Sequence, residues 1–114
     1  MEVAVAKPVA WMGTSRKDLR AFPDGARSVA GRQLYQVQLG RQPADFKPML
    51  SVGSGVYEIR IHTQTEHRLL YVAKFEEAVY VLHAFEKRTR KTDRRDIEIA
   101  RRRLAELFRA RARR

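Results

Sequence analysis

The sequence predicts an α+β domain in which a short N-terminal strand and two helices precede an antiparallel β-meander and a C-terminal helix. Two observations support this prediction. A length of 114 residues suits a single core, and the hydrophobic period is helical before residue 40, alternating from residue 56 to 85, and helical again after residue 93. We therefore expect one domain over residues 9–114, preceded by an N-terminal tail over residues 1–8 that can be disordered.

The N-terminal elements follow from short local signals. The apolar run Val9–Met12 predicts a first strand, and Ser15 then suits the N-cap of a short helix over residues 16–21. A proline and an aspartate open a second helix over residues 23–40, whose apolar positions are Val29, Leu34, Tyr35 and Val37. The segment 41–47 has no clear period, which predicts a loop.

Three strands and a final helix follow. Residues 56–63, 68–75 and 78–85 are rich in β-branched and aromatic residues, and their short connections predict an antiparallel meander, with Glu76-Glu77 as a solvated hairpin end. Thr92 and Asp93 then open a helix over residues 93–112, whose apolar positions are Ile97, Ala100, Leu104 and Leu107 or Phe108. The aromatic and large residues expected in the core are Trp11, Phe22, Tyr71, Val72, Phe75 and Phe85.

The formal net charge of +11 is concentrated near the C-terminus. Residues 1–86 hold 11 Lys and Arg against 9 Asp and Glu, a net of +2, whereas residues 87–114 hold 13 against 4, a net of +9. Such a patch attracts a polyanion such as RNA, although a solvated helix face explains it equally well. No run reaches the roughly 20 apolar residues of a membrane span, so we expect a cytoplasmic protein without a membrane partner.

Motifs for most kinds of catalysis are missing. The sequence has no Gly-rich phosphate loop, no nucleophile elbow, and no cysteine for a disulfide or a thiolate zinc site. His62 and His67 flank a predicted hairpin turn and could approach each other, but no carboxylate partner is evident. We therefore predict no metal and no cofactor.

A set of cations remains on the predicted sheet. Lys47 precedes the first strand of the meander, Arg60 lies inside it, Arg68 opens the second strand, and Lys87 with Arg88 follows the third. An arginine within a strand needs either a carboxylate partner, such as Glu58, or a ligand, because an unpaired buried charge is costly. Side chains alternate along a strand, so Glu58, Arg60 and His62 should share one face. The pattern leaves open whether Arg60 serves pairing or phosphate binding.

Six short motifs, in this order, resemble the RelE toxin superfamily and look most like its phage-derived HigB-like branch. They are Trp11, Leu19-Arg20-Ala21-Phe22-Pro23, Phe46-Lys47-Pro48-Met49, Gly55-Val56-Tyr57-Glu58-Ile59-Arg60, His67-Arg68-Leu69-Leu70-Tyr71 and Leu82-His83-Ala84-Phe85-Glu86-Lys87-Arg88-Thr89. The resemblance extends from about Val9 to the end of the C-terminal helix.

This resemblance implies a RelE-like fold and a toxin of a type II toxin–antitoxin pair, which cuts messenger RNA in the ribosomal A site without a metal or cofactor. The partners would be the translated message and a small antitoxin, in this branch usually a helix-turn-helix protein. By position in the motifs, the implied catalytic residues are Arg60 and Arg68, with Lys47 and Lys87 as further candidates. The residues expected to contact RNA are Phe46, Arg88, Arg90 and Lys91.

The general base stays open at this point. Some relatives use a tyrosine or histidine near the C-terminus, where this chain has arginines. His83 is the nearest substitute, since a neutral imidazole can accept a proton near neutral pH, although a histidine in a strand is more often a core residue. A lysine with a lowered pKa is the other candidate. Two other hypotheses are a non-catalytic RNA-binding module and a toxin relative that only binds its antitoxin.

Overall fold

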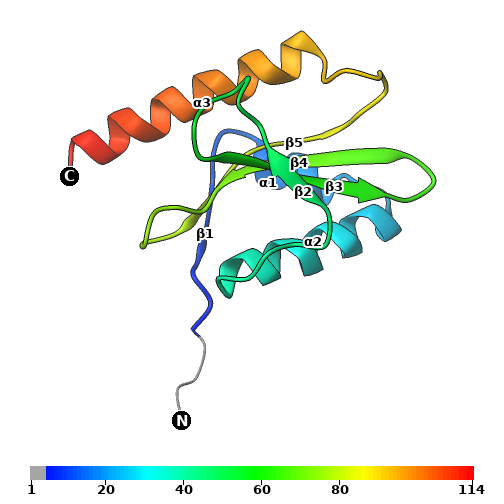
Figure 1. Cartoon of the computed structure of the whole chain (residues 1–114), viewed down its shortest axis with the longest axis horizontal. Coiled ribbons are helices and arrows are strands. Elements are labelled where there is room, and N and C mark those ends of the chain that lie inside the picture. The colour runs from blue at the N-terminus through cyan, green and yellow to red at the C-terminus, as the bar shows by residue number, and fades with distance from the viewer. Residues whose placement is uncertain (1–4) are drawn as a thin grey trace.

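The computed structural model describes residues 5–114 (Figure 1). Its elements are β1 (Val9–Trp11), α1 (Ser15–Arg20), α2 (Asp24–Gln38), β2 (Phe46–Pro48), β3 (Val56–His62), β4 (Glu66–Val72), β5 (Val79–Glu86) and α3 (Arg94–Ala112), which confirms the predicted α+β class. Residues 1–4 of the predicted tail lie outside the described part, whereas Lys7 donates from Nζ to the carbonyl oxygens of Ala73 and Phe75 at 3.0 and 2.9 Å. No helix within residues 5–114 combines the length and apolar character needed to cross a membrane.

One mixed sheet of five strands forms the middle layer, in the order β1-β5-β4-β3-β2. The predicted meander is confirmed, because β3, β4 and β5 are antiparallel neighbours. Strand β1 runs parallel to β5 at one edge, and β2 pairs antiparallel with β3 at the other. The prediction of a loop over 41–47 is therefore wrong at its end, since Phe46 and Lys47 pair with β3 as strand residues.

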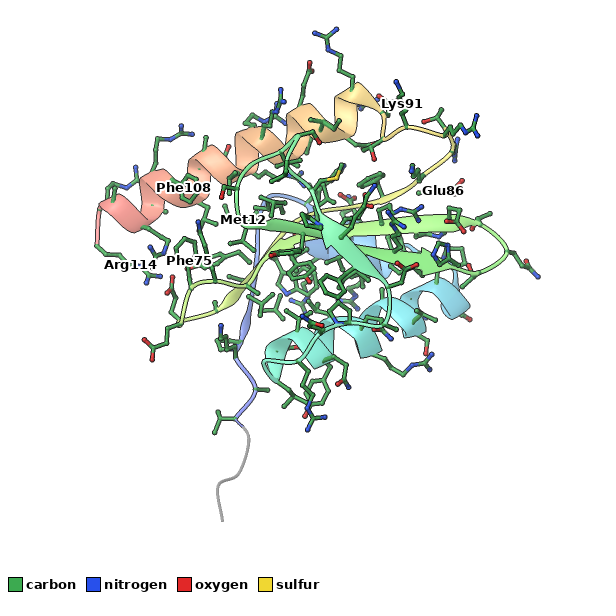
Figure 2. The ribbon with its side chains drawn as sticks, in the orientation of Figure 1. Met12, Phe75, Glu86, Lys91, Phe108 and Arg114 are labelled. Atoms are coloured by element: carbon green, nitrogen blue, oxygen red, sulfur yellow. The ribbon has the colours of Figure 1, made fainter. Side chains whose placement is uncertain are left out.

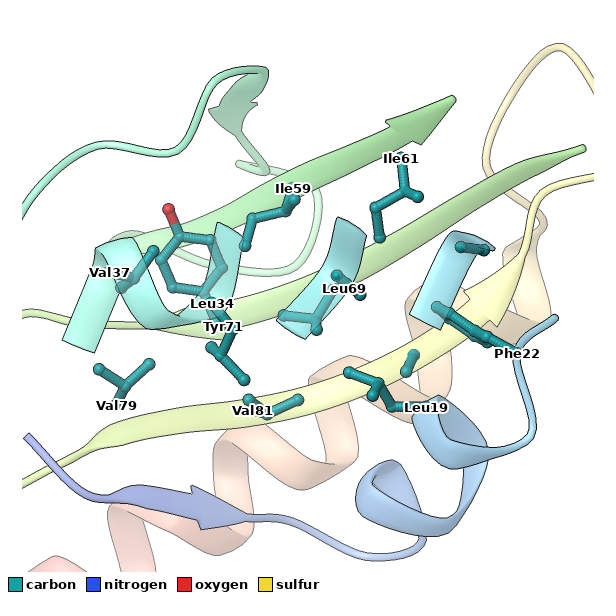
Figure 3. Packing of buried hydrophobic residues seen from close by; sticks show 13 residues of the cluster. Leu19, Phe22, Leu34, Val37, Ile59, Ile61, Leu69, Tyr71, Val79 and Val81 are labelled. Atoms are coloured by element: carbon teal, nitrogen blue, oxygen red, sulfur yellow. The ribbon is translucent and has the colours of Figure 1, made fainter. Parts of the chain in front are cut away.

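Helices cover both faces of the sheet, so each face has its own core. Helices α1 and α2 cover one face, where Ile59 and Leu69 are buried (Figure 3). Helix α3 covers part of the other face (Figure 1). Leu70 of that face packs in the same cluster as Leu104. Side chains alternate along β3 as predicted, so Glu58 lies on the α3 side while Ile59 lies on the α1–α2 side.

The predicted core residues differ in burial. Phe22, Tyr71, Val72 and Phe85 are buried, and Trp11 and Phe75 are half-buried. Tyr35 and Phe108 are instead exposed, at 50% and 43% of their surface. Helical spacing turns their neighbours inward, so Leu34, Val37 and Leu107 occupy the core positions.

The sequence predicts Ser15 as the N-cap of α1, and this prediction is wrong. Ser15 is the first helical residue, and the N-cap is Thr14. Ser15 is fully buried, and its Oγ donates to the carbonyl oxygen of Val81 at 3.1 Å. A buried hydroxyl needs such a partner, so this side chain ties α1 to β5.

Polar contacts fix both ends of α3. Asp93 accepts a hydrogen bond from the backbone N–H of Arg95 at 2.8 Å, which confirms the predicted start of the helix. Near the other end, Glu77 accepts from Arg111 Nε at 2.8 Å, and Phe75 packs edge to face with Phe108 (Figure 2). Hydrogen bonds from Arg111 and Tyr80 lower the pKa of Glu77 to about 2. Glu77 is therefore an anchor and not only a solvated hairpin end.

One arginine of α3 is buried in the middle of the helix. Arg103 donates from Nη1 to the carbonyl oxygen of Leu82 at 2.9 Å and from Nη2 to Thr14 Oγ1 at 3.1 Å. Its guanidinium fills the space beside Gly13, whose φ of +53° also favours glycine. Arg103 therefore joins α3 to β5 and to the turn before α1.

Candidate functional site

Cations gather on the α3-side face of the sheet, at the side formed by β2, β3 and β4. Arg60 on β3 pairs directly with Arg68 on β4, and Lys47 on β2 pairs with Glu58 on β3. Directly paired residues share one face of a sheet, so their side chains meet. Together with Lys87, which follows β5, these residues are called the sheet cluster below.

Glu58 is the shared partner of the sheet cluster. Its Oε1 lies 3.5 Å from Arg60 Nε, 3.8 Å from Arg68 Nε and 3.9 Å from Lys47 Nζ. The side chain is fully buried, and within residues 5–114 neither of its oxygens has a hydrogen-bond partner. A buried carboxylate of this kind is tolerated only beside positive charge, so Glu58 and the cations hold one another in place.

The two arginines differ in exposure and support. Arg60 exposes 33% of its side chain beside Glu58, so the carboxylate pairing that the sequence left open is present and a ligand can still reach the guanidinium. Arg68 exposes only 7%, and its Nη1 donates to the carbonyl oxygen of His67 at 2.9 Å and lies 3.1 Å from Glu66 Oε1. The Nε of Arg68 has no hydrogen-bond partner within residues 5–114. This buried atom lies 3.8 Å from Glu58 Oε1, so the charge of Arg68 supports that carboxylate.

Lys87 completes the sheet cluster. Its backbone N–H donates to the carbonyl oxygen of Glu66 at 2.7 Å, which extends the pairing of β4 one residue beyond β5. Burial lowers the pKa of the Lys87 ammonium, and the positive charge of Arg68 lowers it further. The structure thus brings together four of the five predicted catalytic residues, namely Lys47, Arg60, Arg68 and Lys87.

His83, the fifth predicted catalytic residue, is buried under α3. The pairing of β4 with β5 shifts between Leu70 and Tyr71, and this irregularity turns His83 toward the helix. Its Nε2 lies 2.7 Å from Asp96 Oδ1, and its Nδ1 lies 3.4 Å from Arg103 Nη1. Burial lowers the pKa of the imidazole. Both ring nitrogens of His83 are therefore engaged within the protein.

His62 lies at the border of the sheet cluster, between two carboxylates. Its Nε2 is 2.6 Å from Asp45 Oδ2, and its Nδ1 is 2.7 Å from Glu66 Oε1. The expectation that no carboxylate partner is near His62 is wrong, because Glu66 lies only four residues away along the chain and Asp45 lies 17 residues away. The predicted approach of His62 to His67 is wrong, because adjacent strands place the rings on opposite faces and His67 packs on Phe22, with ring centroids 4.3 Å apart. Within residues 5–114, no three His, Asp or Glu side chains form a group that could hold a metal ion.

The predicted RNA-contacting residues fall into two places. Arg88, Arg90 and Lys91 are exposed in the segment between β5 and α3, near the end of the sheet where Lys87 lies (Figure 2). Arg88 also pairs with Glu86 at 2.9 Å. Phe46 lies on the α1–α2 side of the sheet, where its ring packs against Tyr57 with centroids 6.0 Å apart. The structure therefore does not bring Phe46 to the sheet cluster.

A cleft of about 610 Å³ opens beside Lys87. The turn between α1 and α2, the end of β5 and the first turns of α3 form its walls, and its charged lining residues include Arg88, Arg95 and Asp96. Lys87 belongs to both the cleft and the sheet cluster, so an extended ligand bound at the arginines can continue into the cleft.

The functional side chains that the sequence did not single out are His62 and two of the carboxylates. Glu58 is already indicated by alternation along β3, which places it beside Arg60. Asp45 and Glu66 give no such signal, because their positions depend on how β2 pairs with β3 and on where β4 begins.

Comparison with known proteins gives a matching family and several similar solved chains. The family described as "Phage derived protein Gp49-like" matches residues 17–105. Curated protein sequences give no significant match. Among solved structures, a chain of the toxin–antitoxin complex RelBE2 from Mycobacterium tuberculosis is similar, with 22% sequence identity and a TM-score of 0.45. That alignment covers 73% of this chain and 100% of the other.

Proposed function

Because this chain belongs to the phage-derived Gp49-like family, a family of RelE- and HigB-type toxins, we propose that it is the toxin of a type II toxin–antitoxin pair that cleaves messenger RNA on the ribosome. Within that family, the sequence motifs favour the HigB-like branch. The expected partners are the message in the ribosomal A site and a small antitoxin of the helix-turn-helix class.

The observation that carries this proposal is the sheet cluster. Arg60 and Arg68 lie side by side, and their Nε atoms lie 3.5 and 3.8 Å from one oxygen of a buried carboxylate. Guanidinium groups bind phosphate oxygens in a fixed fork and stay charged at neutral pH. Cations held in place before the substrate arrives are the arrangement that stabilises negative charge as it develops during phosphate chemistry.

The proposed reaction needs only these groups and the RNA. The ribose 2′-oxygen attacks the adjacent phosphorus and gives its proton to a base, while the bond from phosphorus to the 5′-oxygen breaks. The departing 5′-oxygen takes up a proton, and a 2′,3′-cyclic phosphate remains. Negative charge grows on the phosphoryl oxygens during the step, and Arg60 and Arg68 are placed to stabilise it.

Lys87 is better placed than His83 to move the proton. The pKa of Lys87 is lowered by burial and by the positive charge of Arg68, so the free amine forms at a lower pH than in water. His83 already bonds to Asp96 and lies against Arg103, which leaves neither ring nitrogen free for the 2′-hydroxyl. We therefore assign proton transfer to Lys87 and a structural role to His83.

Cleavage on translating ribosomes tests the proposal. Purified protein is incubated with a message alone and with the same message on ribosomes, and the RNA ends are mapped by primer extension. The proposal predicts new ends only with ribosomes, and a 2′,3′-cyclic phosphate on the upstream fragment. Binding to ribosomes without any cleavage would instead indicate the non-catalytic RNA-binding module.

A further inference from the structure

His62 connects the two arginines of the sheet cluster through two carboxylates. Asp45, which bonds to His62 Nε2, also lies 3.9 Å from Arg60 Nη1. Glu66, which bonds to His62 Nδ1, also lies 3.1 Å from Arg68 Nη1. The imidazole thus lies between the outer partner of one arginine and the outer partner of the other.

Glu58 closes this arrangement into a ring. Its Oε1 lies between the Nε atoms of Arg60 and Arg68, at 3.5 and 3.8 Å. Each guanidinium therefore has one carboxylate behind its Nε and another beside its Nη1 atom. Both contacts of Arg60, at 3.5 and 3.9 Å, are ion pairs and not hydrogen bonds, so attraction to two carboxylates restrains its orientation.

The bonds of His62 depend on its charge. An imidazolium has two N–H donors, whereas a neutral imidazole has only one and presents a lone pair at the other nitrogen. The charged groups that face the ring are Asp45, from the segment before β2, and Glu66, from β4, with Arg60 and Arg68 behind them. Hydrogen bonds to Glu66 and Asp45 raise the pKa of His62 above 6.5. Loss of the proton releases one of the two carboxylates.

We propose that His62 is a positioning residue that holds Asp45 and Glu66 at the same time and thereby fixes the orientation of Arg60 and Arg68 for a phosphate. The inference rests on the proposed function only where it concerns the phosphate. The coupling of the imidazole to the two guanidinium groups is a property of the folded chain, so it is measurable without RNA.

Nuclear magnetic resonance tests the coupling directly. The imidazole signals of His62 and the Nε–Hε signals of Arg60 and Arg68 are followed from about pH 5 to about pH 9. The inference predicts that at least one arginine signal moves with the same midpoint as His62, and that this midpoint lies above 6.5. In His62→Gln the movement is lost, while the Nε–Hε signal of Arg111, whose partner Glu77 has a pKa of about 2, stays unchanged as the control.

Cleavage kinetics test the effect on the reaction. His62→Lys keeps a positive charge across this pH range. At each pH, the wild-type rate is divided by the His62→Lys rate. This ratio cancels the pH dependence that arises from Lys87, because both proteins contain Lys87. The inference predicts that this ratio falls by about tenfold as pH rises through the midpoint of His62, which corresponds to about 1.4 kcal/mol. The ratio of His62→Gln to His62→Lys stays constant with pH.

The outcomes separate this inference from the proposed function. If neither arginine signal follows His62, or if the movement persists in His62→Gln, the inference is wrong. If the signals follow His62 but the rate ratio is independent of pH, His62 orders the side chains without positioning them for the reaction, and the inference is again wrong. If the signals follow His62 and the wild type does not cleave at any pH, the coupling stands and the proposed function fails.

Discussion

The sheet cluster and α3 both contain arginines, but the two regions hold them differently. In the sheet cluster, Arg60 and Arg68 lie beside the buried Glu58 and each has a second carboxylate at its outer side. On α3, most arginines extend into solvent, and within residues 5–114 neither Arg102 nor Arg109 makes a side-chain hydrogen bond or ion pair. The sheet cluster gathers a few charges around one buried carboxylate, whereas the exposed arginines of α3 such as Arg102 and Arg109 add charge without a fixed direction.

The two arrangements suit different roles: the sheet cluster suits catalysis, and the exposed charges of α3 suit attraction of RNA. Electrostatic stabilisation of a transition state depends on charges whose orientation is set before the reaction, because reorientation would use up the gain. Attraction of a polyanion depends mainly on the sum of the charges and is screened by salt. The region with the larger net charge is therefore not the region where we expect the chemistry.

The largest effect is expected from Arg68→Lys, which keeps the charge and removes the fork. Lysine cannot contact Glu58, Glu66 and a phosphate oxygen in one plane, so cleavage on ribosomes should fall by about 10²- to 10³-fold. Single-turnover primer extension measures the rate, and thermal unfolding controls for stability. A variant that is folded and cleaves within about twofold of the wild type would show that charge alone is sufficient.

The next largest effect is expected on the free energy of unfolding, and it distinguishes the buried arginine of α3 from an exposed one. Arg103→Ala removes the hydrogen bonds to Leu82 and Thr14 and leaves a void beside Gly13, so the free energy of unfolding should fall by about 2–4 kcal/mol. Arg102→Ala, one residue away and exposed, should change it by less than about 0.5 kcal/mol. Urea denaturation of both variants gives the comparison. Equal losses would mean that Arg103 is only a surface charge.

A smaller effect is expected on salt dependence. Replacing both Arg102 and Arg109 by Gln removes two of the exposed charges of α3, so the affinity for ribosomes should fall several-fold at low salt and the slope of log affinity against log salt should become shallower by up to about 1.4–1.8. The cleavage rate at saturating ribosomes should stay the same. Fluorescence anisotropy with labelled protein at several salt concentrations measures the slope. An unchanged slope would indicate that Arg102 and Arg109 do not contact RNA.

The smallest effect is expected at the C-terminal end of α3. The pKa of Glu77 is lowered to about 2 in the folded protein by Arg111 and Tyr80. The stability that Glu77 contributes is therefore present above the ordinary carboxyl pKa of about 4.5 and is lost as pH falls from there toward 2. The melting temperature of Glu77→Gln should lie slightly below that of the wild type at pH 7 and approach it at about pH 3, while Glu76→Gln serves as the matched control. If the difference in melting temperature between Glu77→Gln and the wild type stayed constant across this pH range, the ion pair of Glu77 with Arg111 would be contradicted.

The sequence pattern predicts the fold to the extent that the hydrophobic period reports burial. The change of period near residue 56 predicts the meander, and the spacing of Ala100 and Leu104 predicts the buried face of α3. Short strands at an edge carry too few residues to show a period, so β2 was predicted as part of a loop. Ser15 suits an N-cap by residue type, but its hydroxyl is bound by a strand that is distant in sequence.

For the candidate site too, the sequence predicts what depends on local alternation and misses what depends on the pairing of distant strands. The alternation of side chains brings Glu58 and Arg60 to one face, and the family resemblance identifies Arg60 and Arg68. The irregular pairing of β5 is not visible in the sequence, yet it turns His83 toward Asp96 and removes it from the candidate bases. The contacts of His62 require the pairing of three strands, which only the folded chain provides.

The single-turnover rates of message cleavage by Arg60→Gln and Arg109→Gln at saturating ribosomes show whether the position of a positive charge matters. Each variant removes one positive charge, the first from the sheet cluster and the second from the exposed part of α3. We expect a loss of about 10²-fold or more for Arg60→Gln and a rate within about twofold of the wild type for Arg109→Gln. Equal losses in the two variants would contradict this expectation, because the position of the charge would then not matter.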